Sequence, residues 1–315
     1  MMREAGVEQP PANTRAATPR TSGRRVVFMQ RISFVEDRPP RRIFAAWIAG
    51  IRAAIVIPAA AGGDSRLDFR ARGPRIAGME AEHPVLRRMR GGLIVSCQPE
   101  AESRTSDPMN SPMIMAALAR AAVLGGAVGV RVDSPADIAA VRAAVAVPVI
   151  GIFKRDVAGF DVRITPTLAE ASSVAEAGAD IIAVDATSRP RPDGRSASDL
   201  IRAVKAATGK PVFADVATIR EGVLAEEAGA DAVLPTLAGY AGGNVVADGP
   251  DFALLASLVE TLRVPVIAEG RISTPAQAAR SLQLGAWAVC VGSAITRPRW
   301  ITASFASALG RGTGG

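Results

Sequence analysis

The sequence Glu176-Ala-Gly-Ala-Asp180 recurs as Glu227-Ala-Gly-Ala-Asp231, and again in the shorter form Gln283-Leu-Gly-Ala286. In each copy an Ala-rich stretch leads to a Gly, and a short apolar run follows at once. A Gly in this place typically adopts the left-handed conformation that ends a helix. The repeat therefore predicts a helix-to-strand turn that the chain uses several times in one role.

The same pattern extends from Gly91 towards the C-terminus. Eight apolar runs alternate with stretches rich in Ala, Leu and Glu, which are residue types typical of helices. The predicted strands are 92–97, 127–132, 148–153, 180–184, 211–214, 231–234, 265–268 and 287–291. The predicted helices are 112–124, 134–145, 167–177, 196–208, 218–228, 251–262, 274–284 and 299–309. Ser134, Thr167, Thr218 and Ser273 stand where N-caps are expected.

This alternation of strand and helix decides the fold class. It requires a parallel sheet with right-handed crossovers. Eight units in about 225 residues match the (β/α)8 or TIM barrel. A doubly wound open sheet is the alternative, but that fold normally has a Gly-rich loop after its first strand, which is absent here. We therefore predict an α/β protein with a TIM-barrel catalytic domain over residues 85–315.

The first 84 residues differ in composition from the rest. Residues 1–90 hold 17 Arg and 8 acidic residues, a net charge of +9, so the remaining chain carries −2 of the total of +7. We predict an Arg/Ala/Pro-rich extension over residues 1–84 that is disordered or precedes a natural start at Met79 or Met89. Residues 43–61 resemble a signal or membrane segment, but Arg52 argues against a spanning helix.

The residue inventory excludes several classes of site. His83 is the single histidine and lies before the barrel strands, which excludes a catalytic His or a His zinc ligand there. Cys97 and Cys290, the two cysteines, lie in apolar runs and are expected to be buried thiols. We expect neither a metal nor a cofactor. The near-neutral barrel also weakens the case for nucleic-acid binding.

Polar or ionisable residues end nearly every predicted strand. In a TIM barrel the carboxyl ends of the strands form one rim, and the active site lies there. The residues at these ends are Gln98, Arg131, Lys154, Asp185, Asp215, Thr236, Glu269 and Gly292–Ser293. Each one alone could be a strand-end residue facing water, but together they favour a ligand site.

Two loops predict a phosphate site. Gly270 follows strand seven and Gly292 follows strand eight, and both glycines would let backbone amides approach an anion. Arg271 and Arg297 add positive charge in the same loops. The polar, Pro-rich segment 189–195 after strand four is interpreted either as a flap over the mouth or as a solvated loop.

Lys154 is the candidate base. The chain has only three lysines, Lys154, Lys205 and Lys210, and Lys, unlike Arg, can lose its proton when partly buried. A lysine that merely snorkels from a strand end explains this position equally well. Like charge from Arg131 or Arg155 would depress its pKa, and Glu269 could move a second proton. This set suits proton abstraction beside the carbonyl of a phosphosugar, and equally a Schiff-base aldolase.

Nine motifs, in order and spacing, resemble the N-acetylmannosamine-6-phosphate 2-epimerase family. They are Gly91–Gln98, Gly125–Arg131, Ile152–Asp156, Ile164–Thr167, Val184–Thr187, Arg191–Gly194, Thr236–Tyr240, Ala268–Ile272 and Gly292–Pro298. The resemblance covers nearly all of residues 91–310 and none of residues 1–78. It implies a TIM barrel that interconverts N-acetylmannosamine 6-phosphate and N-acetylglucosamine 6-phosphate in amino-sugar and sialic-acid catabolism, in the cytoplasm and without an added cofactor.

The resemblance also implies residue roles. Lys154 matches the lysine that removes and returns the C2 proton, and Glu269 matches its partner carboxylate. With the rim residues, the predicted substrate contacts are Gln98, Arg131, Asp185, Thr187, Asp215, Thr236 and Gly239. The predicted phosphate contacts are Gly270, Arg271, Gly292, Ser293 and Arg297. The chain departs from the family pattern at Val157, Ser188, Pro190 and Ala238, which puts affinity in question more than reaction type.

The expected partner is a phosphosugar, with neither nucleic acid nor membrane, and a homodimer is left open. Three competing interpretations remain. One is a Schiff-base aldolase or lyase acting on a phosphosugar. Another is an inactive barrel that binds phosphosugars as a sensor or scaffold. A third makes the basic extension a tether to nucleic acid or membrane.

Overall fold

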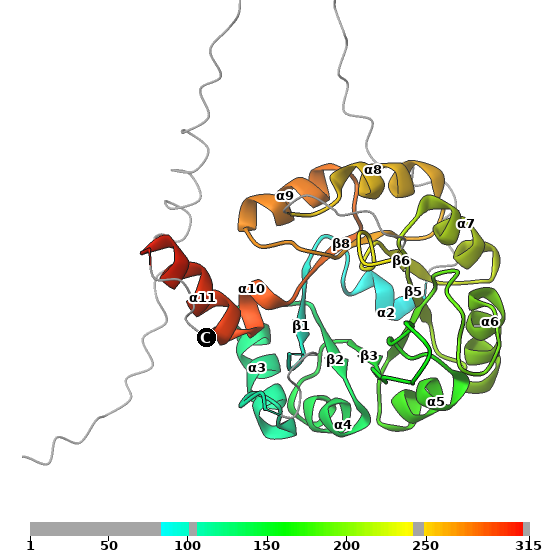
Figure 1. Cartoon of the computed structure of the whole chain (residues 1–315), viewed down its shortest axis with the longest axis horizontal. Helices are drawn as coiled ribbons and strands as arrows, with labels where there is room; N and C mark the ends of the chain where they lie inside the picture. The colour runs from blue at the N-terminus through cyan, green and yellow to red at the C-terminus, as the bar shows by residue number, and fades with distance from the viewer. Residues whose placement is uncertain (1–82, 101–105, 242–248, 311–315) are drawn as a thin grey trace, which may run out of the picture. The chain divides into compact units, whose positions relative to one another are not determined.

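The computed structural model describes residues 83–100, 106–241 and 249–310, arranged as a ring of strands surrounded by helices (Figure 1). The strands are β1 (Leu93–Cys97), β2 (Gly129–Asp133), β3 (Val149–Ile152), β4 (Ile181–Asp185), β5 (Val212–Asp215), β6 (Ala232–Leu234), β7 (Ile267–Ala268) and β8 (Ala288–Val291). The predicted extension, with its apolar segment 43–61 and Met79, lies outside the described residues except for its last two positions.

The helices alternate with the strands as predicted. They are α2 (Pro84–Arg87), α3 (Pro112–Leu124), α4 (Pro135–Ala144), α5 (Leu168–Glu176), α6 (Ala197–Thr208), α7 (Ile219–Glu227), α8 (Phe252–Thr261), α9 (Pro275–Gln283), α10 (Ser293–Thr296) and α11 (Pro298–Ala308). Nowhere in these described ranges is a helix both long and apolar enough to cross a membrane.

All strand pairs are parallel, and the sheet order is β6-β5-β4-β3-β2-β1-β8-β7. The ring closes where β6 meets the residue before β7 in a parallel bridge between Val233 and Val266. There the Val233 amide donates to the Pro265 carbonyl at 3.0 Å. The predicted TIM barrel is therefore confirmed.

The core has two layers because every strand is buried on both faces. Inside the ring, Ile94, Ile150 and Phe213 belong to one apolar cluster. Between the strands and the helices, side chains such as Val130 and Leu200 form the other. This explains why the strands are nearly continuous apolar runs in the sequence. Cys97 and Cys290 are buried free thiols, as predicted.

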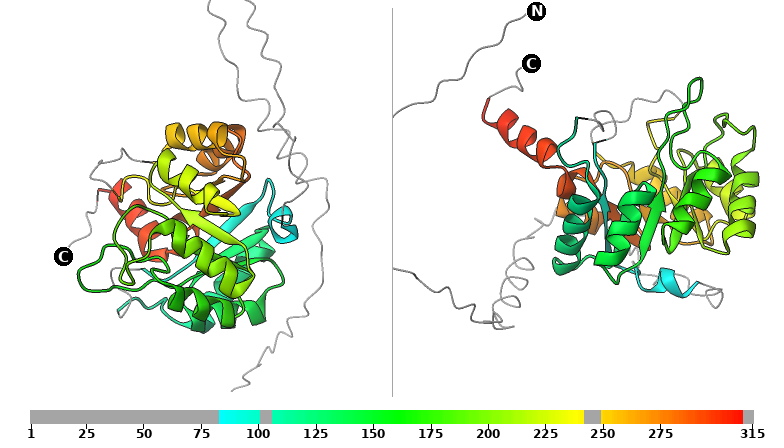
Figure 2. Two further views of the ribbon diagram at one scale, coloured as in Figure 1. Left: turned by 90° about the vertical axis from the view of Figure 1, so that its right-hand side faces the viewer. Right: turned by 90° about the horizontal axis from the view of Figure 1, so that it is seen from below.

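The short helix α2 fills the amino end of the barrel. Leu86 and Met89 are fully buried and belong to the inner cluster. Trp287 donates its indole N–H to the Leu86 carbonyl at 3.3 Å, and the Arg90 guanidinium lies 4.6 Å from the Trp287 ring centroid. In the right-hand view of Figure 2, α2 lies below the strands. Residues 84–90 are thus part of the packed barrel.

Local turn chemistry follows the sequence with one exception. Gly178, Gly229 and Gly285 have φ of 95°, 91° and 95°, so the repeated junction does use left-handed glycines. Ser134, Thr167 and Thr218 cap their helices. The predicted cap at Ser273 is wrong. Thr274 caps α9 instead, because it forms a capping box with Gln277 that satisfies two backbone amides at once.

Candidate active site

A cavity of about 580 Å³ opens at the carboxyl ends of the strands. Ten of the predicted site residues line it: Gln98, Arg131, Lys154, Thr236, Glu269, Gly270, Arg271, Gly292, Ser293 and Arg297. They come from six strands or the loops that follow them, so the strand ends do converge on one rim. The candidate base and the candidate acid therefore face the same space.

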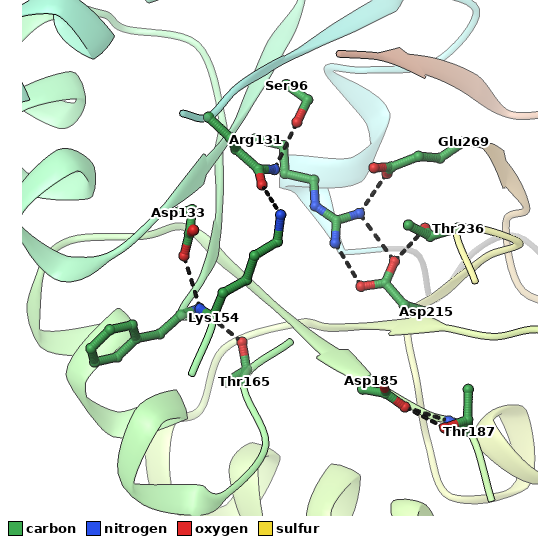
Figure 3. Close-up of polar contacts among 12 residues, drawn as sticks. Ser96, Arg131, Asp133, Lys154, Thr165, Asp185, Thr187, Asp215, Thr236 and Glu269 are labelled. Atoms are coloured by element: carbon green, nitrogen blue, oxygen red, sulfur yellow. Dashed lines mark hydrogen bonds and ion pairs between the residues drawn. The ribbon is translucent and has the colours of Figure 1, made fainter. Parts of the chain in front are cut away.

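Lys154 follows β3, and its amine points into this cavity (Figure 3). The Nζ donates to Gln98 Oε1 at 2.7 Å, and Gln98 Nε2 donates to Ser96 Oγ at 2.7 Å. Burial lowers the pKa of Lys154 from 10.5 to about 8. The side chain is still partly open to the cavity. At pH 7, roughly a tenth of such amines are neutral and able to accept a proton.

Neighbouring charges modify this lowered pKa. Asp133 opposes the decrease, whereas the positive charges of Arg131, Arg297 and Arg163 add to it. The predicted contribution of Arg131 is therefore present, although burial is the larger cause. Arg155 has another contact, with its guanidinium 5.5 Å from the centroid of the Phe153 ring.

Arg131 is buried among three polar side chains that lie at or just after the ends of three other strands (Figure 3). Its two terminal nitrogens donate to the Asp215 carboxylate at 3.0 and 2.6 Å, and Nη1 also donates to Glu269 Oε2 at 2.5 Å. The Thr236 hydroxyl donates to Asp215 Oδ1 at 2.5 Å. One guanidinium thus orients two carboxylates, in the bidentate geometry that Lys cannot offer.

Glu269 lies on the cavity side of this network. Burial raises its pKa, the nearby Asp215 raises it further, and Arg131 opposes both. For Arg131 itself, burial alone would lower the pKa, but the two carboxylates outweigh burial and raise it. The guanidinium therefore stays charged, while Glu269 accepts a proton more readily than an exposed glutamate.

Four predicted site residues do not line the cavity. Asp215 is fully buried beneath Arg131. Asp185 accepts from the Thr187 amide at 2.9 Å, from the Thr187 hydroxyl at 2.6 Å and from Arg189 Nη2 at 2.7 Å. Gly239 lies in the turn after β6, at φ 78°. That these four touch substrate stays a prediction.

The segment 189–195 is anchored rather than freely solvated. Arg191 is 3% exposed, and its guanidinium donates to the carbonyls of Asp185, Thr187 and Arg189. Asp193 and Arg195 pair with each other on the exposed side of the segment. The interpretation as a purely solvated loop is therefore wrong for Arg191, which ties the segment back to the end of β4.

The predicted phosphate loops line the cavity with unusual backbone. Gly270 has φ 116° and Arg271 has φ 52°. The Arg271 guanidinium donates to the carbonyls of Gly249 at 2.8 Å and Ala238 at 2.6 Å, and lies 5.5 Å from the Tyr240 ring centroid. Arg271 thus braces two neighbouring loops at the rim. Phosphate contact by these loops stays a prediction.

Sequence reasoning missed several lining residues, among them Ser96, Cys290, Tyr240 and Trp300. Ser96 precedes Gln98 by two positions, and Cys290 precedes Gly292 by two. Because residues two apart on a strand point to the same face, this spacing could have predicted both. Trp300 gave no such signal, since it lies in a helix expected to cover the barrel. Across the described ranges, no group of three or more His, Cys, Asp or Glu residues is arranged to hold a metal ion.

Comparison with known proteins decides the family. The family model NanE, with the description "Putative N-acetylmannosamine-6-phosphate epimerase", matches residues 115–311. This match spans more than half of the chain. The chain belongs to the NanE family. The resemblance inferred from the sequence motifs is therefore confirmed.

Relatives of this family align over nearly their whole length. One relative is a protein of Thermosynechococcus vestitus with the name "Putative N-acetylmannosamine-6-phosphate 2-epimerase". It is 50% identical over 208 residues, which cover 66% of this chain and 89% of that protein. A protein of Caldanaerobacter subterraneus with the same name is 43% identical over 222 residues, covering 70% and 92%.

A solved structure supports the same assignment. The structure of the N-acetylmannosamine-6-phosphate 2-epimerase from Clostridium perfringens matches with a TM-score of 0.68 and 40% identity, over 72% of this chain and 96% of that one. The NanE relationship therefore rests on both sequence and fold.

Proposed function

We propose that this NanE-family protein interconverts N-acetylmannosamine 6-phosphate and N-acetylglucosamine 6-phosphate, as a step of amino-sugar catabolism. The observation that carries the proposal is the pairing of Lys154 and Glu269 in one cavity. Burial lowers the pKa of the lysine and raises that of the glutamate, which favours a neutral base beside a carboxyl acid. The names of the relatives supply the substrate.

The chemistry needs a carbonyl beside the reacting carbon. In the ring-opened sugar, C1 is an aldehyde and the C2–H bond is weakly acidic. The neutral Lys154 amine takes the C2 proton, and the electron pair of the C2–H bond moves onto O1. The Glu269 carboxyl then gives a proton to the opposite face of C2 as this electron pair returns, which forms the epimer. The resulting ammonium and carboxylate are reset by proton exchange with water. The positive charge of Arg131 nearby favours the developing negative charge on oxygen.

The lining of the cavity suits an anionic sugar. Arg131, Lys154, Arg271 and Arg297 bring positive charge, and Glu269 supplies the carboxylate. A volume of about 580 Å³ is within the ordinary range for small-molecule sites. We assign Gly270, Gly292 and Ser293 to the phosphate because their loops offer backbone amides without bulky side chains.

Exchange of the C2 hydrogen with heavy water, followed by proton NMR, tests the reaction. The wild-type protein should exchange that hydrogen in N-acetylmannosamine 6-phosphate, and Lys154→Met should lose exchange while keeping its fold. Lys205→Met is the matched control, because Lys205 bonds Asp231 and the Gly229 carbonyl and does not line the cavity. Exchange that persists in Lys154→Met would remove this lysine from the mechanism.

A Schiff-base aldolase or lyase also fits the lowered pKa of Lys154, since a neutral amine attacks carbonyls. Borohydride trapping separates the two functions. Covalent attachment of the sugar to Lys154, located by mass spectrometry and absent from Lys154→Met, would favour the aldolase. An epimerase should exchange the proton without a trapped adduct.

We also propose that the protein forms a homodimer through α11. No residue of α11 is buried within the described chain, and Phe305 and the following Leu309 are 70% and 80% exposed. In Figures 1 and 2, α11 projects from the ring of helices. Such a face is typical of an interaction surface. Light scattering should report a dimer for the wild type and a monomer for Phe305→Glu, and an unchanged mass would contradict the proposal.

A further inference from the structure

Two buried side chains hold the main chain at the candidate base (Figure 3). Asp133 Oδ1 accepts from the Lys154 amide at 2.9 Å, and Thr165 Oγ1 accepts from the Phe153 amide at 3.1 Å. Asp133 is 2% exposed, and Thr165 is fully buried. Lys154 therefore does not simply follow β3. Its backbone is fixed from two neighbouring segments.

Asp133 acts where the ladder between β2 and β3 runs out. The Ser134 amide still donates to the Ile152 carbonyl at 2.9 Å, as expected between parallel strands. Ser134 then turns away to cap α4. The next amide to face β2 is that of Lys154, just after β3. It donates to the Asp133 carboxylate in place of a main-chain carbonyl. A charged acceptor thus stands where a neutral one would complete an ordinary sheet.

Both anchors come with backbone strain. Three non-glycine residues have positive φ among those that the structure describes: Ser134 at 82°, Thr165 at 47° and Arg271 at 52°. Residues with a Cβ adopt this region at a cost of about 1 kcal/mol or more. One strained residue directly follows Asp133, and another is the second anchor itself. Strain concentrated on both supports of one lysine is typical of a functional constraint rather than of packing.

We propose that Asp133 is a positioning residue that holds Lys154 over the substrate and supplies the negative charge that balances the cations around its amine, while Thr165 supplies a neutral anchor beside it. This inference rests on the proposed function, because it concerns the base of that reaction. Asp133 does not line the cavity and acts through Lys154.

The charges around the amine come from several elements. Arg131 on β2, Arg163 in the segment after β3 and Arg297 after α10 are cations that lower the pKa of Lys154, and burial lowers it more. Gln98 after β1 is a neutral acceptor, and Glu269 after β7 lies in the same cavity and pairs with Arg131. Asp133 opposes the cations and raises that pKa. Without its charge, Lys154 would be neutral at lower pH but less strongly basic.

Two substitutions separate the two roles of Asp133. Asp133→Asn keeps an acceptor for the Lys154 amide and removes the charge, whereas Asp133→Ala removes both. Asp180→Asn is the matched control, because Asp180 Oδ2 accepts from the Val149 amide at 2.8 Å, at the opposite end of β3. A carboxylate that only supports the strand should behave alike at either end.

Titration of the lysines in the full chain by NMR gives a readout that does not require activity. With [¹³C]lysine labelling the chain shows three lysine signals, and Lys154→Met assigns the signal of interest. We expect Asp133→Asn to lower the midpoint of Lys154 by about one pH unit, as loss of a nearby opposite charge does. Asp180→Asn should leave this midpoint unchanged.

Proton exchange at C2 gives the second readout. In Asp133→Asn, the acidic limb of the pH profile of kcat/KM should move to lower pH, by the same amount as the NMR midpoint of Lys154. In Asp133→Ala, kcat should fall at least tenfold below that of Asp133→Asn at every pH, because small misplacements of a catalytic group are costly. Asn therefore rescues what Ala loses, which a role in stability alone would not produce.

A Lys154 midpoint that is the same in wild type and Asp133→Asn would overturn the proposal, even if Asp133→Ala does not fold. Equal shifts in Asp133→Asn and Asp180→Asn would also overturn it. Failure of the proposed function would give a different experimental result. The wild-type protein would then leave the C2 hydrogen unexchanged, while the lysine titration would still test the inference about Asp133.

Discussion

At the scale of single residues, burial acts on Lys154 and Glu269 in opposite directions. It lowers the pKa of the amine and raises that of the carboxyl, and each change favours the uncharged form. The two groups line one cavity, with Arg131 bonded to the carboxylate. An amine that can take a proton thus shares one space with a carboxyl that can give one, without a histidine.

The lowered pKa of Lys154 should appear in the pH dependence of stability. Between about pH 8 and 10.5 the unfolded chain keeps a proton on Lys154 that the folded protein has lost. Stability of the wild type should therefore rise with pH across this window, relative to Lys154→Met, by at most about 1.4 kcal/mol per pH unit. Urea unfolding of both proteins at several pH values measures the difference, and parallel curves would contradict the lowered pKa.

Arg131 should be required for stability as well as for catalysis. Arg131→Met leaves Asp215 and Glu269 buried near each other without their shared cation. Breaking a buried ion pair on one side typically costs about 3–5 kcal/mol. Denaturant unfolding should show this loss, and adding Asp215→Asn to Arg131→Met should recover part of it. A double variant no more stable than Arg131→Met would argue against charge repulsion as the cause.

The sequence could predict which residues stand at strand ends, but not which way each one points. Lys154 and Glu269 could be placed at the rim because each follows a buried run, and the structure puts both in the cavity. Asp185 and Asp215 satisfied the same criterion, yet their partners, Arg189 and Arg131, draw them into buried networks. Asp133 was missed, although it lies two positions after Arg131 on the same strand.

At the scale of elements, the repeated junction does more than end a helix. Asp180 Oδ2 accepts from the Val149 amide at 2.8 Å and from Arg142 Nη1 at 2.7 Å. Asp231 Oδ2 accepts from the Val212 amide and from Lys205 Nζ, both at 2.8 Å. Each Asp ties its strand to the start of the preceding strand and to the helix before that strand, α4 or α6. The repeat predicted the turn but not this link, because the partners lie a whole unit upstream.

Gly151 in β3 shows how closely the helices pack on the strand that leads to Lys154. A Cβ at this position would lie 2.5 Å from Val174 Cγ1 and 2.7 Å from Ala179 Cβ. Gly151→Ala should therefore destabilise the protein by about 1–3 kcal/mol, as overpacking of a core typically does. Thermal unfolding measures this. Gly209→Ala, where nothing lies within 4 Å, reports the smaller cost of a positive φ alone.

At the scale of the whole molecule, the sequence predicted the eight units of the barrel but not how the helices α11 and α2 pack at its ends. Helix α11 was expected from residues 299–309 and spans Pro298–Ala308, yet it projects from the ring instead of covering it (Figure 1). An apolar helix face predicts that the helix packs against another apolar surface, but it does not identify that surface. Likewise, α2 was placed outside the repeating pattern, although Leu86 lies in the inner core.

The packing of α2 predicts where the barrel can be shortened. A chain of residues 79–315 keeps Leu86 inside the ring together with the bond from Trp287 to the Leu86 carbonyl, whereas a chain of residues 89–315 loses both. The shorter chain should unfold at a markedly lower temperature, because it opens the inner core at its amino end. In the full-length protein, Leu86→Ala should cost about 2–5 kcal/mol by the same mechanism. Equal thermal stability of the two shortened chains would mean that α2 only covers the barrel, and would leave Met89 as good a first residue for a folded barrel as Met79.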